Sequence, residues 1–354
     1  MRARPRHLVV LVGVVVVLVG VAAGVLVAWL GDDDTRLGSA ASLAPAGSDR
    51  LSWTDWAAVR REVGADLPRT PSTEQVQGLL DEAFERDLTN SSALVESAPS
   101  LHEEFGFSPA SLSWELFAQS PDGAVEILGF PESFDLSGLT DRLGRLGFTE
   151  PSSADGVWRG GGDLLARIGF QLTPELQHVA VLEDEHLVLT SDRPGFLEHA
   201  VDVVQGDADA VSGLSDVVSA SGSPVAASVY SGSHACGALA MGTADEDAQA
   251  EAEALVERAG EVNPMTGFAM SVQPDGNVRV AMSFEDDDQA RANADSRRAL
   301  ASGPAPGQGG DFADRFTVES AVAEGSTVVL DLDPVEGQYV LSDLSSGPVL
   351  FATC

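Results

Sequence analysis

Residues 8–30 form a run of 23 residues without a charged side chain. At 1.5 Å rise per residue, a helix of this length crosses the roughly 30 Å hydrocarbon core of a bilayer. Arg2, Arg4 and Arg6 precede the run, and three aspartates follow it at positions 32–34. Because positively charged flanks remain on the cytoplasmic side, the pattern predicts a single-pass membrane protein with its N-terminus in the cytoplasm.

A cleaved signal peptide is the alternative, because small residues such as Ala22 and Ala28 provide a cleavage site. The apolar region of a signal peptide is usually about 7–15 residues long, and this run is longer, so we favour an uncleaved anchor. We therefore expect a cytosolic tail over residues 1–7, a transmembrane anchor over residues 8–30 and an extracytoplasmic C-terminal domain at the cell membrane.

The charge balance restricts the partners. The 354 residues include 55 acidic and 20 basic side chains, all of the latter arginine, for a formal charge of −35. The three charged residues before the anchor are all arginines, so residues 31–354 carry a formal charge of 17 − 55 = −38. Nucleic acid is excluded as a partner because phosphate binding needs a basic face, and lysine chemistry is excluded outright. We interpret the acidity as a solvated surface; attraction of cations or basic partners is the alternative.

Cys236 and Cys354 are the only cysteines, and both follow the anchor. An oxidising compartment favours a disulfide between them, with two free thiols as the alternative. The bond would join residues 118 positions apart. Two cysteines are too few for a cysteine-rich zinc site or a disulfide-dense scaffold.

Residues 31–50 are small and polar, which predicts a flexible stalk. Residues 51–110 are predicted to be a helical segment. Within it, Ser72 with Gln75 matches a capping box that opens a helix over residues 73–88.

A second capping box is predicted from Ser52 with Asp55, opening a helix over residues 53–63. Trp53 and Trp56 would then lie three positions apart on this helix. We expect the pair to pack into the core; binding of a ring or a glycan is the alternative.

From residue 111 the pattern changes to strands. Two apolar runs flank Pro121-Asp122-Gly123, a sequence that favours a hairpin turn. An apolar helical stripe, a second strand pair and a helix after Pro194 follow. The expected elements of this first α+β unit, residues 111–205, are strands over 112–119, 124–130, 179–182 and 186–190 and helices over 136–146 and 195–204.

The same order returns in a second α+β unit, residues 265–354. Pro274-Asp275-Gly276 repeats the turn 153 positions after its first occurrence. The expected elements are strands over 268–272, 278–284, 316–321 and 327–332 and a helix over 288–300.

We interpret residues 111–205 and 265–345 as two β-β-α-β-β repeats; chance recurrence of a common hairpin is the alternative. Residues 206–264 connect them through a strand over 224–230 and an acidic helix over 245–259. Since hairpins dominate and no strand–helix–strand alternation occurs, the fold class is α+β, with antiparallel sheet and packed helices behind the transmembrane helix.

The search for catalytic motifs is negative. The sequence contains no Gly-x-Ser-x-Gly, no His-Glu-x-x-His and no Gly-x-Gly-x-x-Gly between a strand and a helix. We therefore predict no catalytic residue, no metal ligand and no cofactor.

Three histidines are candidate metal ligands. His178 and His186 flank a predicted hairpin, and Glu183 or Glu185 would complete a metal site with them. The alternative, which we favour, is that these two and His199 are unrelated surface residues.

Two further clusters have structural explanations. Tyr230, Ser231, Ser233, His234 and Cys236 are close in sequence, but a Ser-x-x-His spacing has no general catalytic meaning. The acidic runs at 245–247 (followed by Glu251 and Glu253) and 285–288 begin predicted helices, where acidic side chains favour the helix dipole. Weak divalent-cation binding is the alternative for the acidic runs.

The layout resembles that of signal-anchored extracytoplasmic proteins of high-GC Gram-positive bacteria. The resemblance rests on the arginine tail, the valine-rich anchor, the small-residue stalk and the arginine-only basic set. It covers the layout of the first 50 residues and only composition beyond them. It implies no activity and supplies no site residue.

The favoured hypothesis for function is a non-catalytic module of the cell envelope that binds a protein, glycan or lipid partner. Residues 8–30 would anchor this module in the membrane. One alternative is a solute or lipid carrier, which a closed apolar pocket would support. The other is an enzyme with an unrecognised site, which converging titratable groups with shifted pKa values in a cleft would support.

Overall fold

The computed structural model describes residues 35–345 and 347–354. The predicted cytosolic tail, the anchor and the first four residues of the predicted stalk lie outside the described residues. Arg36–Cys354 forms one compact unit. None of the helices in the described part of the chain combines the length and the apolarity needed to cross a membrane.

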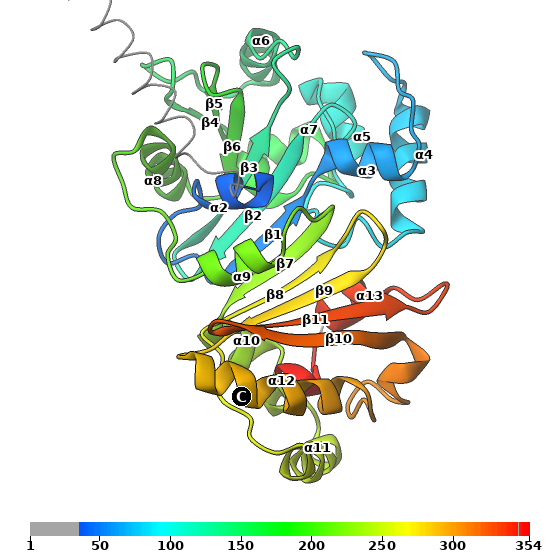
Figure 1. Ribbon diagram of the computed structural model, residues 1–354. Coiled ribbons are helices and arrows are strands. Elements are labelled where there is room, and N and C mark those ends of the chain that lie inside the picture. Colours follow the sequence, from blue (N-terminus) through cyan, green and yellow to red (C-terminus); the bar gives the residue numbers. More distant parts are fainter. Residues whose placement is uncertain (1–34, 346) are drawn as a thin grey trace, which may run out of the picture. The chain divides into compact units, whose positions relative to one another are not determined.

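One antiparallel sheet of eleven strands organises this unit, in the order β10-β11-β9-β8-β7-β1-β2-β3-β6-β5-β4 (Figure 1). The protein therefore belongs to the α+β class. The strands are β1 (Arg50–Thr54), β2 (Trp114–Ser120), β3 (Gly123–Gly129), β4 (Val157–Arg159), β5 (His178–Leu182), β6 (Leu187–Ser191), β7 (Ala226–Ser231), β8 (Gly267–Val272), β9 (Val278–Ser283), β10 (Phe316–Glu324) and β11 (Thr327–Pro334).

Helices cover both faces of the sheet. They are α2 (Arg36–Ala41), α3 (Trp56–Glu62), α4 (Thr73–Phe84), α5 (Ala98–Ser100), α6 (Ser137–Leu146), α7 (Gly162–Ile168), α8 (Pro194–Gln205), α9 (Ser215–Ala220), α10 (Gly232–Ala238), α11 (Glu246–Ala259), α12 (Asp287–Ala301) and α13 (Val340–Ser345). Short helical turns add η1 (Leu101–Phe105), η2 (Pro174–Gln177), η3 (Met241–Thr243), η4 (Phe312–Asp314) and η5 (Leu350–Ala352).

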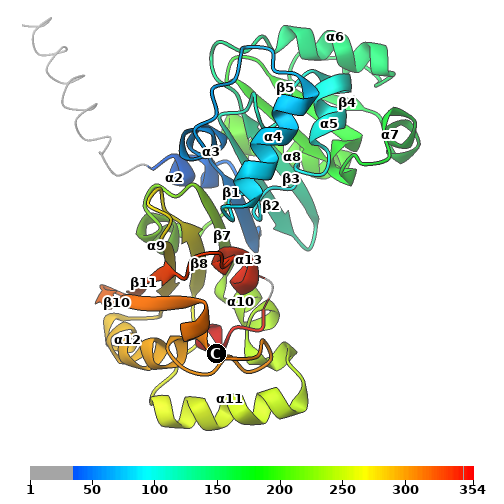
Figure 2. The same cartoon turned by 90° about the vertical axis from the view of Figure 1, so that its right-hand side faces the viewer.

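The two faces carry separate apolar cores. The buried side chains of α3–α7 and α10–α13 belong to the core on what we call the first face, and those of α2, α8 and α9 to the core on the second face. In Figure 2, α9 lies on one side of β7 and β8, and α10 and α13 lie on the other. Neighbouring residues of a strand alternate between the cores: Val188 belongs to the first, and Leu187 and Leu189 to the second. Where both faces are covered, as at β6, every residue of the strand is buried, whereas the edge strand β10 alternates with exposed residues.

The two halves of the sheet share the order of five strands. One half has in addition the edge strand β4, which lies with α7 between α6 and β5 in the sequence. In one half the strands lie in the order β1-β2-β3-β6-β5, and in the other in the order β7-β8-β9-β11-β10. In each half a helix, α6 or α12, connects the third strand to the last hairpin. The first strands of the two halves, β1 and β7, pair with each other at the centre of the sheet.

The stalk prediction is wrong for residues 36–50. Leu37 and Ala40 of α2 are buried, and α2 contacts α9. Ala44 accepts a backbone hydrogen bond from Val211 at 2.8 Å. The small residues of this segment allow close packing against the second face, so their composition indicates tight contact here and not flexibility.

The helix predicted over residues 53–63 begins too early. Residues 50–54 form β1, which pairs with β2 on one side and β7 on the other. The helix α3 begins at Trp56, and its N-cap is Asp55, whose side chain accepts a hydrogen bond from Ala58 N at 2.8 Å. Pairing on two sides satisfies the backbone of β1, and this overrides the local capping signal of Ser52.

The capping box of Ser72 and Gln75 is confirmed. Both reciprocal hydrogen bonds are present, and α4 follows directly. Its buried residues are Val76, Leu79, Leu80 and Ala83, the stripe expected at the helical period. The helix ends at Phe84, four residues earlier than predicted.

Candidate functional site

The structure does not bring the candidate metal ligands together. The β5–β6 hairpin pairs Leu182 with Leu187, so His178 lies opposite Ser191, at the far end of the hairpin from His186. His199 lies on α8. Among the described residues, no group of three or more His, Cys, Asp or Glu side chains is arranged to hold a metal ion. Burial, followed by the charge of Arg159, lowers the pKa of His178.

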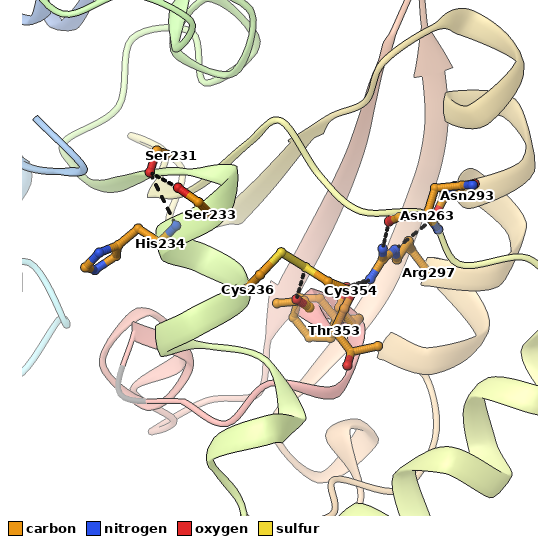
Figure 3. Close-up of a disulfide and its surroundings, with 11 residues drawn as sticks. Ser231, Ser233, His234, Cys236, Asn263, Asn293, Arg297, Thr353 and Cys354 are labelled. Carbon is orange, nitrogen blue, oxygen red and sulfur yellow. Dashed lines mark hydrogen bonds between the residues drawn. A yellow bond between two sulfur atoms is a disulfide. The ribbon is translucent and has the colours of Figure 1, made fainter. Parts of the chain in front are cut away.

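Ser231 is a helix cap and not a nucleophile paired with a base. Its Oγ accepts a hydrogen bond from the backbone N of His234 at 3.3 Å and donates one to Asp49 Oδ1 at 2.9 Å. The His234 ring points away from this serine (Figure 3). It stacks on Tyr230 instead, with ring centroids 5.9 Å apart. The sequence cluster around Ser231 is therefore explained by the β7–α10 corner.

The predicted disulfide is present. Cys236 on α10 and Cys354 are bonded, with their Cα atoms 5.7 Å apart (Figure 3). The bond links the last residue of the chain to a helix that packs on β7 and β8.

A buried arginine reinforces this attachment. Arg297 of α12 is fully buried, and it donates hydrogen bonds to Phe351 O at 2.9 Å, Asn263 O at 2.7 Å and Thr353 O. Its Nε donates to Asn293 Oδ1 at 3.1 Å. Burial lowers the pKa of Arg297 to about 10. Backbone carbonyls and an amide, in place of a carboxylate, accept the hydrogen bonds of this cation, so we assign it a structural role in holding the C-terminal segment.

The acidic runs also cap helices, as the sequence indicates. Asp245 accepts a hydrogen bond from Ala248 N at the start of α11, and Asp286 accepts one from Gln289 N at the start of α12, both at 2.9 Å.

Trp53 and Trp56 do not share a helix. Trp53 belongs to the core of the second face and Trp56 to that of the first, and each is at most 1% exposed. The Trp53 ring stacks on Trp114 at 5.6 Å. The Trp56 Nε1 atom donates a 2.8 Å hydrogen bond to Glu115 Oε2. The acceptor, Glu115, is a buried carboxyl that the sequence analysis did not single out.

Glu115 is a fully buried carboxyl on β2. Besides Trp56, it accepts hydrogen bonds from Ser92 Oγ at 2.8 Å and Ala93 N at 2.7 Å. Burial raises its pKa to about 7 against the opposing effect of these donors. The carboxyl connects α3 and the loop after α4 to the sheet.

Glu126, on the neighbouring strand β3, is held differently. Both of its carboxyl oxygens are buried and have no hydrogen-bond partner among the described residues. The hydroxyl Oγ1 of Thr190, the cross-strand neighbour of Glu126 on β6, is also buried and has no such partner there. Burial raises its pKa well above the ordinary value, with further contributions from the negative charges of Glu115 and Glu175. Burial without a hydrogen-bond donor therefore favours the neutral form of the Glu126 carboxyl in the folded protein.

More polar residues gather where the two halves of the sheet meet. Arg50, Ser52 and Thr54 of β1 and Ser228 and Tyr230 of β7 form what we call the central seam. The strand register pairs Arg50 with Tyr230 and Ser52 with Ser228. Four buried polar atoms of the seam have no hydrogen-bond partner within the part of the chain described: Arg50 Nε, Thr54 Oγ1, Ser228 Oγ and Tyr230 Oη.

The seam ends at a surface pocket of about 340 Å³, which we call the seam pocket. It is lined by Asp49, Arg50, Gln119, Ser120, Pro121 and His234. The Arg50 guanidinium lies over the Tyr230 ring, 5.5 Å from its centroid. Because Tyr230 also stacks on His234, two lining side chains of the pocket contact the same buried ring. The sequence singles out only two residues of this pocket, Pro121 as part of a hairpin turn and His234 in the cluster around Ser231, and it does not bring them together. The lining comes from segments far apart in the sequence, around β1, β2 and α10.

Comparison with solved structures finds distant likenesses. No protein-family model matches the chain, and no curated protein matches it. Crystal forms I and IV of TP0453 align with TM-scores of 0.38 and 0.39 at 7% and 8% identity. The alignments cover 88% and 90% of this chain and 97% and 99% of TP0453. Scores this low support no conclusion about site or function.

Proposed function

We propose that the chain is a membrane-anchored extracytoplasmic protein of the cell envelope whose folded unit binds a partner and catalyses no reaction. Residues 8–30 would hold it in the membrane, with the N-terminus in the cytoplasm and the disulfide-bonded unit outside. The layout shared with signal-anchored proteins of high-GC Gram-positive bacteria supports the same location.

The disulfide is the observation that carries the location. Bonds of this kind persist outside the cytoplasm, where no thiol-reducing system acts on them. The bond between Cys236 and Cys354 supports the same location as the arginine tail and the apolar run do.

The arrangement of polar groups favours binding over catalysis. Glu115 and Glu126 have raised pKa values, as catalytic acids often do, but both carboxyls are enclosed in the core and out of a substrate's reach. The seam pocket, in contrast, opens to the surface and exposes polar side chains that have no hydrogen-bond partner among the described residues. A pocket of this type lies where ligand sites are common, at the junction of two structural units.

We also propose that the two halves of the sheet are copies of one unit. The shared strand order extends the expected β-β-α-β-β repeat by one strand, so each copy begins with β1 or β7. The seam would then be the interface between the copies.

Reporter fusions test the location. A reporter enzyme that is active only outside the cytoplasm, fused after Cys354, should be active in cells. Exchange of Arg2, Arg4 and Arg6 for glutamate should reduce that activity, because the positive flank orients the anchor. An inactive reporter, together with activity of a cytoplasm-specific reporter at the same position, would overturn the proposed location.

Site-directed photocross-linking tests the binding role. The protein contains no lysine, so amine-reactive reagents would miss its side chains. A photoreactive amino acid at Gln119 in the seam pocket should give a reproducible adduct in native membranes. The same residue at Gln205, exposed on α8, is the control and should give none. Equal labelling at both positions, or none at either, would contradict a binding role for the pocket.

A further inference from the structure

The seam pocket has the size of a small-molecule site. Its volume of about 340 Å³ lies near the lower end of the roughly 300–1,000 Å³ that ligand sites occupy. This is room for about one or two sugar-sized rings and not for a folded protein segment.

Three of its side chains are free to bind a ligand. Arg50, Gln119 and His234 make no side-chain hydrogen bond or ion pair with any residue that the structure describes. Two other lining groups are already engaged: Asp49 Oδ1 accepts from Ser231, and Ser120 Oγ donates to Gly123 O. The free groups are partly exposed and lie side by side, since the register places Arg50 opposite Gln119.

The charge of the pocket favours a neutral ligand. Asp49 and Arg50 contribute one negative and one positive charge to the lining. The remainder of the protein beyond the anchor is strongly acidic, with a formal charge of −38 over residues 31–354, and repels anions. A cation would lie beside the unpaired guanidinium of Arg50. Neither an anionic nor a cationic ligand therefore gains electrostatic attraction from this pocket.

The donor and acceptor pattern favours hydroxyl groups. Arg50 offers only donors, the Gln119 amide offers donors and an acceptor side by side, and Asp49 offers only acceptors. A ligand that matches all of them must both donate and accept at neighbouring atoms, as the adjacent hydroxyls of a saccharide do. Pro121 supplies apolar surface for the C–H face of a sugar ring.

The pocket is also rigid. Tyr230 is 1% exposed, and the Arg50 guanidinium and the His234 ring both contact it. A side chain that is held before binding loses less conformational entropy when the ligand arrives.

We propose that the seam pocket binds a saccharide through its neighbouring hydroxyls, with Arg50 and Gln119 as the principal hydrogen-bonding residues. This inference rests on the proposed function, in which the pocket faces the glycan-containing space outside the membrane.

Saturation-transfer NMR tests the proposal directly. The full chain should be held in lipid nanodiscs, because glycoside detergents would compete for the pocket. The probes are glucose, galactose, arabinose, N-acetylglucosamine and the disaccharide of N-acetylglucosamine. At least one should show saturation transfer and a saturable titration. Gln119→Ala should weaken its binding by about 3- to 10-fold, the effect of one lost hydrogen bond, and Arg50→Gln by at least as much.

Gln205→Ala, an exposed change on α8 that does not line the seam pocket, is the matched control and should bind as the unchanged protein does. A thermal melt of each variant checks that Arg50→Gln leaves the fold intact; Gln119→Ala carries the test if it does not. The proposal is overturned if no probe binds, or if Gln119→Ala binds as tightly as the control. Such a failure together with an active external reporter and a Gln119 photoadduct would leave the proposed function standing and exclude only the saccharide.

Discussion

Glu115 and Glu126 lie on the same face of adjacent strands, and the protein treats the two carboxyls in opposite ways. Three donors surround Glu115, whereas Glu126 has none among the described residues. An anion at Glu126 would lack both water and a donor, so folding favours its neutral form. This residue therefore links stability to pH.

We expect Glu126→Gln to reduce the pH dependence of stability. Because the pKa is raised in the folded state, the contribution of Glu126 is fully present below its ordinary value of 4.5 and is lost as the pH rises through the folded-state pKa. The variant should therefore gain stability relative to the unchanged protein as the pH rises from 5 to 8. Urea denaturation at several pH values measures this; Glu132→Gln, an exposed change in the loop after β3, is the control. Parallel pH profiles for Glu126→Gln and the unchanged protein would contradict the assignment.

Arg297 gives the second prediction at this scale. Arg297→Met removes the donors to three backbone carbonyls and an amide, which leaves buried acceptors unpaired. We expect a loss of about 2–4 kcal/mol in the free energy of unfolding. Arg298→Met, the exposed neighbour on α12, should change it by less than about 0.5 kcal/mol. Similar losses for the two variants would show that the hydrogen bonds of Arg297 do not hold the C-terminal segment.

At the scale of elements, the β2–β3 hairpin shows how one glycine admits a large neighbour. Trp114 lies directly across from Gly129, and a Cβ atom on that glycine would be 2.1 Å from Trp114 Cε2. The same indole stacks on Trp53 of β1. The absent side chain thus lets the hairpin join the core of the second face.

We expect Gly129→Ala to cost about 1–3 kcal/mol, because the displaced Trp114 ring cannot keep its contact with Trp53. Near-ultraviolet circular dichroism should report the loss of the tryptophan stack, and thermal unfolding the loss of stability. Gly144→Ala in α6, where nothing lies within 4 Å of the added atom, should instead stabilise by up to about 1 kcal/mol. An unchanged dichroism spectrum for Gly129→Ala would refute the packing argument.

The elements that the sequence predicts correctly carry their signals locally. The Pro-Asp-Gly turns mark the β2–β3 and β8–β9 hairpins, and the Ser72 capping box marks α4. The strand β1 carries no comparable signal, because its stability comes from β2 and β7, which follow it by about 60 and 175 positions. Local propensity cannot represent pairing over such separations.

For the whole molecule, the disulfide is a covalent cross-link between residues 118 positions apart. Reduction should raise the intact mass by about 2 Da and lower the free energy of unfolding by roughly 4–5 kcal/mol in the chain-entropy model. The double variant Cys236→Ser with Cys354→Ser should have the lower stability and no response to reductant. If reductant shifted the melting of both proteins equally, the effect would not come from this bond.

The residues of the candidate site also differ in whether the sequence predicts them. The cysteine pair follows from the composition and the expected compartment, so it could be predicted. Glu115, Glu126 and Arg50 could not, because alternation in a strand separates its two faces without stating what covers each. Both faces of this sheet are covered, so a charged residue within a strand need not point to solvent.

The sequence by itself determined the local turns, the longer helices α4, α6, α8, α11 and α12, the α+β class and the pair of cysteines that bond. The tertiary structure decided which strands meet at the centre, that residues 36–54 join the folded unit, and that the seam pocket exists. The physical reason is the sequence separation of the interacting residues. Turns, caps and amphipathic stripes depend on neighbours a few positions apart, whereas the seam pocket depends on Arg50, Gln119 and Tyr230 meeting across the sheet.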